Sequence, residues 1–63
     1  MDYKTLKIDR EGAVEWLTLN RPDNMNTLDP VMKDELWHYF DRLYTDRSVR
    51  VVVMRGAGRM FCA

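Results

Sequence analysis

The apolar run at residues 49–54 constrains the fold of this chain more than any other segment. Its residues are valine or methionine except for Arg50, so both faces of an extended strand would be apolar. Such a strand is typical of the interior of a parallel sheet that is covered on both sides. We therefore predict a buried strand over residues 50–55. A chain of 63 residues with one helix cannot complete that cover, so the predicted fold is unfinished.

Two shorter segments before this run also have the composition of strands. Residues 3–9 and 13–20 are rich in β-branched, aromatic and leucine side chains, and the turn-forming residues 10–12 separate them. We predict a two-stranded hairpin. Residues 21–26 gather side chains that bend the chain and bond their own backbone, which predicts a loop.

A helix is predicted from about Pro30 to about Tyr44. Asp29 can accept hydrogen bonds from the first backbone N–H groups, and proline fits the first helical position. The charged residues Asp34, Glu35 and Asp41 are predicted on the solvent side. The apolar stripe contains Met32, Leu36, Tyr39, Phe40 and Leu43. The predicted order is β-β-α-β, an α/β arrangement.

Composition narrows the classes of partner. Ten basic residues balance ten acidic ones without a basic cluster, which argues against nucleic acid and anionic membranes. Cys62 is the only cysteine, so neither an intrachain disulfide nor a zinc site built from a cysteine pair is expected. The start lacks an apolar signal core, and no eighteen apolar residues run together. We expect a soluble, cytoplasmic protein that begins at its true N-terminus.

Several residues invite a catalytic role that their context does not support. His38 stands between two aromatic residues on the predicted helix, which favours packing over general-base catalysis. Cys62 has no neighbouring histidine in sequence, which favours a buried filler over a nucleophile. Residues 56–58, Gly-Ala-Gly, follow a strand but lack the third glycine and the helix start of a dinucleotide-binding loop. None of these residues is assigned a catalytic or metal-binding role.

Two segments resemble motifs of the enoyl-CoA hydratase/isomerase (crotonase) family. Residues 17–28, LTLNRPDNMNTL, resemble its LNRP-x-x-x-N-x-L element. Residues 56–63, GAGRMFCA, resemble the start of its G-x-G-x-x-F-C/S-A-G-x-D segment. An acidic helix and an apolar strand lie between them, as in the family. Jointly these matches are specific, and they cover nearly the whole chain.

The resemblance implies a fold built from repeated ββα units wound into a spiral. Residues 1–63 would form the N-terminal part of that spiral domain, its β-β-α-β start, and would stop before the glycine expected after Ala63. Members of the family form trimers that often pair into hexamers. The expected partners are therefore the remainder of the same enzyme and further copies of it.

The resemblance also implies a groove for coenzyme A. Ala63 would lie beside the pantetheine arm. Four residues would face the adenosine-phosphate end: Asp23, Asn24, Met25 and Thr27. Many members carry Lys or Arg within residues 23–25, whereas this chain has Asp23 there, and Arg21 and Arg59 could supply a cation for the phosphates instead. Coenzyme A is expected only as part of the thioester substrate, without a tightly bound cofactor.

The family's shared chemistry uses two backbone N–H groups to stabilise a thioester enolate. One belongs to the residue after the glycine expected beyond Ala63 and the other to a later strand–helix junction, so no catalytic residue is expected here. The resulting hypothesis is part of an acyl-CoA hydratase, isomerase, hydrolase or lyase. The alternatives are a non-catalytic truncated fragment or interaction piece and, less favoured, a stand-alone nucleotide-binding module.

Overall fold

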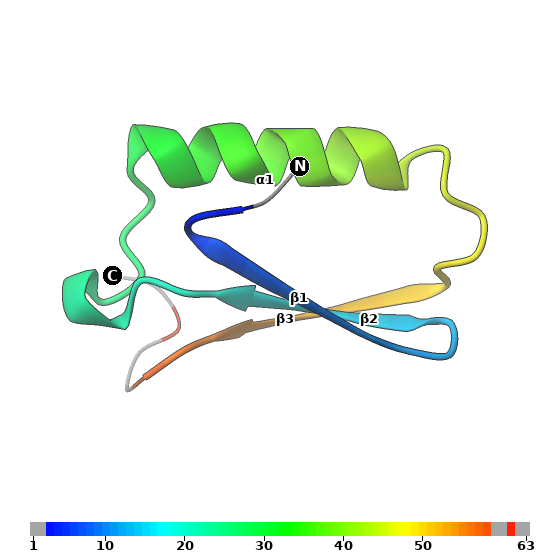
Figure 1. Ribbon diagram of the computed structural model, residues 1–63, viewed down its shortest axis with the longest axis horizontal. Helices are drawn as coiled ribbons and strands as arrows, with labels where there is room; N and C mark the ends of the chain where they lie inside the picture. The colour runs from blue at the N-terminus through cyan, green and yellow to red at the C-terminus, as the bar shows by residue number, and fades with distance from the viewer. Residues whose placement is uncertain (1–2, 59–60, 62–63) are drawn as a thin grey trace.

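The computed structural model describes residues 3–58 and 61 of the chain. Their elements follow the predicted β-β-α-β order, with one short 3₁₀ turn added (Figure 1). The elements are β1 (Leu6–Glu11), β2 (Val14–Leu19), η1 (Pro22–Asn24), α1 (Pro30–Leu43) and β3 (Val51–Gly56). The α/β class, the hairpin, the helix and the last strand are therefore confirmed, each within a few residues of its predicted bounds.

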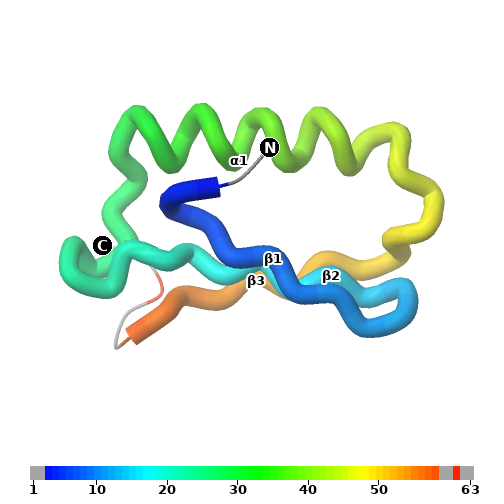
Figure 2. Tube along the Cα trace, in the orientation of Figure 1, coloured from blue at the N-terminus to red at the C-terminus, as the bar shows by residue number. Residues whose placement is uncertain are grey.

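The three strands form one sheet in the order β1-β2-β3. β1 and β2 pair antiparallel from Leu6 opposite Leu19 to Glu11 opposite Val14, and Gly12 takes a positive φ of 61° in the turn between them. β3 returns through α1 to pair parallel with β2, with Val14 opposite Val51. The tube in Figure 2 shows this crossover, with α1 running along one face of the sheet. This connection places the carboxyl-terminal ends of β2 and β3 at the same end of the sheet.

The predicted cap begins α1. The Asp29 carboxylate accepts from the Met32 backbone N–H at 2.8 Å, and Pro30 occupies the first turn. This satisfies one of the N–H groups that lack a partner within the helix. No helix in the described part of the chain is long and apolar enough to cross a membrane.

The core lies between α1 and the sheet face beneath it. Its buried apolar residues are Leu6, Leu17, Leu19, Met32 and Tyr39. No helix among the described residues covers the opposite face (Figure 1). On that face the Arg55 guanidinium lies 5.0 Å from the centre of the Trp16 ring. The structure is thus two layers, with the second face of the sheet open.

Two predictions about burial were wrong for this chain. β3 was expected to be buried, but Val51 is 50% exposed and Met54 is 42% exposed, because β3 is an edge strand with a neighbouring strand on one side only among the described residues. Glu35 was expected on the solvent side, but it is 4% exposed. Glu35 follows Met32 by three residues and precedes Tyr39 by four, so helical spacing puts it on the buried face. Because the buried face of α1 contains Glu35 instead, Phe40 lies outside it and is 43% exposed.

Candidate functional site

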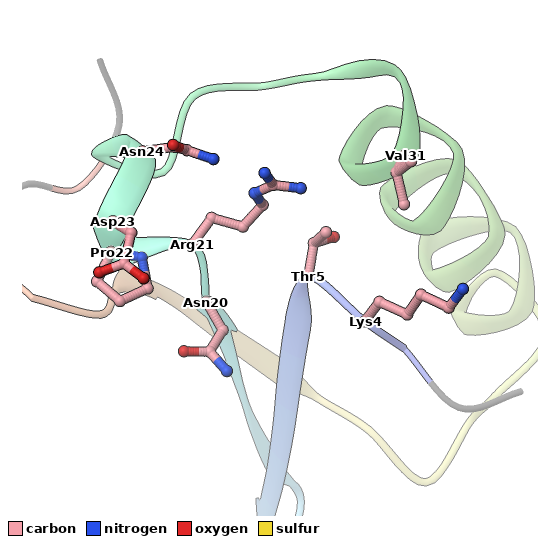
Figure 3. A pocket seen from close by; sticks show the side chains of 8 residues that line it. All are labelled: Lys4, Thr5, Asn20, Arg21, Pro22, Asp23, Asn24 and Val31. Carbon is pink, nitrogen blue, oxygen red and sulfur yellow. The ribbon is translucent and has the colours of Figure 1, made fainter.

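A cleft opens at the end of the sheet where β2 runs into the following loop. It encloses about 330 Å³, and the residues around it come from the start of the chain, this loop and the first turn of α1 (Figure 3). Its lining residues are Lys4, Thr5, Asn20, Arg21, Pro22, Asp23, Asn24 and Val31. The carboxyl ends of neighbouring parallel strands are where α/β sheets commonly bind ligands. This cleft is therefore the candidate site.

The loop after β2 has a defined backbone conformation. The Arg21 carbonyl accepts from the N–H groups of Asn24, at 3.0 Å, and of Asn26, at 2.8 Å. Met25 and Asn26 both take the left-handed conformation, with φ values of 53° and 55°. Non-glycine residues adopt this conformation at a cost, so the surrounding contacts must hold the loop in place.

Asn26 connects this loop to the segment after β3. Its side chain is fully buried, its Oδ1 accepts from the Arg21 N–H at 2.7 Å, and its Nδ2 donates to the Ala57 carbonyl at 2.8 Å. The Ala57 N–H in turn donates to the Leu19 carbonyl at 2.8 Å. The two segments that resemble family motifs are thereby joined directly.

A close approach between Gly58 and Pro22 confirms how near these segments lie. Gly58 has a φ of +80°, and a Cβ added to it would lie 2.8 Å from the Cβ of Pro22. Glycine is the residue that tolerates both this backbone conformation and this separation. The resemblance placed the two motifs at one site, and the structure brings their described residues together.

The positively charged side chains at the cleft differ in whether they already form an ion pair. The Arg21 guanidinium lies 2.7 Å from the Asp29 carboxylate, which also caps α1, so its charge is already engaged. Lys4 is exposed, and its ammonium group has no ion-pair partner among the residues described. Arg59, the other cation suggested for the phosphates, lies outside the described residues.

Glu35 fixes the start of the chain beside the cleft. Its carboxylate accepts from the Lys4 N–H at 2.8 Å, and from the N–H and hydroxyl of Thr5 at 2.8 and 2.6 Å. Burial acts to raise the pKa of Glu35, but these hydrogen bonds outweigh it, so the pKa lies below its ordinary value. Glu35 is therefore an ionised anchor.

The predicted site residues fall into three groups. Asp23 and Asn24 line the cleft. Met25 and Thr27 are exposed on the same loop without lining it, and the Thr27 hydroxyl donates to the Asn24 carbonyl at 2.6 Å. The prediction for Ala63 falls outside the described residues.

Sequence analysis missed the part of the cleft formed by Lys4, Thr5 and Val31. No motif marks the first two, but the spacing of Glu35 between Met32 and Tyr39 was a usable signal for a buried carboxylate. His38 packs as predicted, with its Nδ1 3.0 Å from the Tyr3 hydroxyl. Within the described residues, no group of His, Cys, Asp or Glu is arranged to hold a metal ion.

Comparison with known proteins decides the family. The sequence profile of the enoyl-CoA hydratase/isomerase family matches residues 9–63. This chain belongs to that family. The (E)-benzylidenesuccinyl-CoA hydratase of Thauera aromatica is 46% identical over 87% of this chain, and the probable enoyl-CoA hydratase of Rhizobium meliloti is 36% identical over all of it. The chain spans only 22% and 24% of these two proteins.

Solved structures of the family share the fold. The enoyl-CoA hydratase from Bacillus anthracis superposes with a TM-score of 0.93 at 29% identity, over 95% of this chain and 24% of that one. A probable enoyl-CoA hydratase/isomerase from Mycobacterium abscessus gives the same TM-score at 40% identity, over 98% of this chain and 24% of that one. The β-β-α-β arrangement is thus a recurring part of the enoyl-CoA hydratase/isomerase fold.

Proposed function

We propose that this chain forms one part of the coenzyme A groove in an acyl-CoA hydratase, isomerase, hydrolase or lyase. The observation that supports this most strongly is that the two family motifs meet at one end of the sheet, after the carboxyl-terminal ends of β2 and β3 and beside an open cleft. The groups that carry out the chemistry, including both oxyanion-stabilising N–H groups, belong to segments other than these 63 residues.

In this proposal the loop after β2 contacts the nucleotide end of the thioester. The contacting residues are Asp23, Asn24, Met25 and Thr27, and Ala63 lies beside the pantetheine arm. The exposed backbone and amide groups of this loop suit the phosphate and ribose oxygens of coenzyme A. Because Asp23 repels phosphate and Arg21 is paired with Asp29, Lys4 is the cation that we assign to the phosphates.

The proposed enzyme works as an assembly. The remainder of the enzyme would cover the open face of the sheet and β3, and copies would associate into a trimer or hexamer in the cytoplasm. The exposed valine and methionine side chains of β3 support the need for such cover. Taken alone, the 63-residue chain is expected to fold poorly and to turn over no acyl-CoA.

A hybrid protein tests the proposal. Residues 1–63 of this chain replace the matching segment of the Bacillus anthracis enoyl-CoA hydratase, and crotonyl-CoA turnover is measured for the hybrid, the parent and the 63-residue chain alone. The hybrid should turn over crotonyl-CoA, and the chain alone should not. Turnover by the chain alone, or a folded hybrid that binds no coenzyme A ester, would contradict the proposal.

A substitution at Ala63 tests the arm contact within the same hybrid. A tryptophan there would fill the space proposed for pantetheine, so Ala63→Trp should weaken binding severely, whereas Thr27→Ala should change it little because the backbone carries the contact. Calorimetric titration of a non-reactive acyl-CoA analogue at fixed ionic strength measures both. If the folded Ala63→Trp hybrid binds as tightly as the unsubstituted one, the groove lies elsewhere.

The alternative of a non-catalytic fragment or interaction piece makes a different prediction. The enzyme proposal requires the encoding message to continue beyond Ala63 with a glycine and then x-Asp-Leu-like sequence, as in the family motif. The alternative does not require it. Sequencing the transcript across this point separates the two.

A further inference from the structure

The Asn26 side chain occupies the point where the loop after β2 meets the segment after β3. It is fully buried, and its two ends bond to backbone groups that are far apart in sequence. Oδ1 accepts from the Arg21 N–H at 2.7 Å, and Nδ2 donates to the Ala57 carbonyl at 2.8 Å. One amide therefore fixes the distance between two backbone segments.

The backbone of Asn26 supports the same role. Its φ of 55° lies in the left-handed region, which most residues avoid but which asparagine visits more readily than most. A serine or threonine in its place would be shorter or would meet this backbone conformation less readily. The position thus combines the backbone requirement with the need for one acceptor and one donor on opposite sides.

The contact between Gly58 and Pro22 is a second, independent constraint on the same separation. A Cβ on Gly58 would lie 2.8 Å from the Pro22 Cβ, so a residue with a side chain at this position would force the segments apart. The amide bridge holds the two segments together, and Gly58 leaves the room that this separation requires. The spacing between the segments therefore depends on both residues.

We infer that Asn26 is a positioning residue that sets the separation between the two walls of the coenzyme A groove, and thereby the affinity for the nucleotide end of the thioester. This rests on the proposed function. Asn26 itself is fully buried, so a ligand in the groove would not reach it. It acts through the exposed neighbours Asn24 and Met25, whose position depends on the loop that Asn26 anchors.

The effect of Asn26 should depend on whether the substrate carries the nucleotide end of coenzyme A. Releasing the loop weakens contacts with the nucleotide, while the acyl group reacts at groups carried by other segments. The KM for a full coenzyme A thioester should therefore rise, and kcat should stay the same. A pantetheine thioester lacks the nucleotide, so its kcat/KM should not change.

The test compares crotonyl-CoA with crotonyl-pantetheine in the hybrid protein. Asn26→Gly keeps the positive φ and removes the two side-chain hydrogen bonds described above, to Arg21 and Ala57. The KM for crotonyl-CoA should rise at least about tenfold, because two hydrogen bonds are lost, with kcat and the pantetheine reaction within about twofold. Asn26→Asp keeps the acceptor for Arg21 but places a buried carboxylate oxygen against the Ala57 carbonyl oxygen, so the KM should rise at least as much as for Asn26→Gly.

Gly58→Ala disturbs the same junction from the segment after β3, because the added Cβ would push against Pro22. It should give the same selective rise in KM, and it replaces Asn26→Gly if that variant does not fold. Gly12→Ala is the matched control, because it strains a positive φ at the hairpin turn with nothing within 4 Å of the added Cβ. It should lower stability without changing the ratio of the two KM values.

Equal losses on both substrates would show a merely structural role, and unchanged kinetics would show no role. Either result overturns the inference. A folded hybrid with Asn26 intact that does not prefer the coenzyme A ester over the pantetheine ester would instead contradict the proposed function.

Discussion

Both ends of the sheet place polar side chains next to a small core, but these side chains have different kinds of partner. At the loop end, the buried Asn26 and Glu35 side chains make bonds of 2.6–2.8 Å, mostly to backbone groups. At the hairpin end, the buried Glu15 carboxylate lies 3.5 and 3.4 Å from the half-exposed Arg10 and Arg42 guanidinium groups. Backbone partners hold a fixed geometry, whereas long solvated side chains do not.

Tyr39 adds to this contrast. It is fully buried near Glu15, yet its hydroxyl has no hydrogen-bond partner among the described residues. Burial, together with the neighbouring Glu15 carboxylate, raises the pKa of Tyr39 above its ordinary value, so the group stays neutral. At the loop end, the buried side chains of Asn26 and Glu35 thus have hydrogen bonds of defined geometry. At the hairpin end, the ion pairs of Glu15 contribute stability without fixing the positions of their partners.

The largest expected effect is the loss of the loop-end anchor. Glu35→Ala leaves the N–H groups of Lys4 and Thr5 without their acceptor, and the cost should be about 3 kcal/mol of unfolding free energy. Urea unfolding of the hybrid protein measures it. A loss below about 1 kcal/mol would mean that water replaces the carboxylate and that the two ends are alike.

Acid should weaken the loop end through Glu35. The pKa of Glu35 is lowered in the folded chain, so its contribution is complete above the unfolded value near 4.5 and is lost as pH falls through the folded pKa. Glu35→Gln should flatten this acid limb of stability. The measurement is urea unfolding of both proteins from pH 7 to pH 3, and parallel curves would contradict the assignment.

A smaller effect is expected at Glu15. Glu15→Gln removes the attraction to Arg10 and Arg42, which remain solvated, so the loss should be about 1 kcal/mol and should shrink in high salt. Affinity for coenzyme A esters should not change, because the site is at the other end of the sheet. A change in affinity would show that the ends are coupled.

The smallest effect has the opposite sign. Tyr39→Phe removes a buried hydroxyl that has no partner in the described structure, so the hybrid should gain up to about 1 kcal/mol in unfolding free energy. Thermal unfolding at neutral pH measures this gain. A loss would show that the hydroxyl bonds to Glu15 in solution and that the hairpin end is more specific than we describe.

Sequence reasoning was strongest where one local signal decides the outcome. The Asp29-Pro30 cap placed the helix start correctly, and the apolar run placed the last strand to within one residue. The family motifs pointed to the loop at residues 22–27, part of which lines the cleft. These features depend on neighbours in sequence.

It failed where burial depends on distant segments. The exposure of Val51 and Met54 depends on what covers an edge strand, which no local pattern states. The role of Asn26 depends on the Ala57 carbonyl, and the position of Lys4 depends on the Glu35 carboxylate of α1. The predicted exposure of Glu35 was wrong because its charge was given more weight than its position on the helix.

The edge position of β3 has a consequence for how this chain behaves while nothing covers that strand. Four consecutive uncharged residues, Val51 to Met54, lie on a strand whose outer backbone groups are unpaired within the described structure, a combination that templates intermolecular strand addition. Arg50 and Arg55 flank this run as charged gatekeepers that discourage stacking. While its edge is uncovered, this strand is therefore open to pairing with another chain, and the two arginines oppose that pairing.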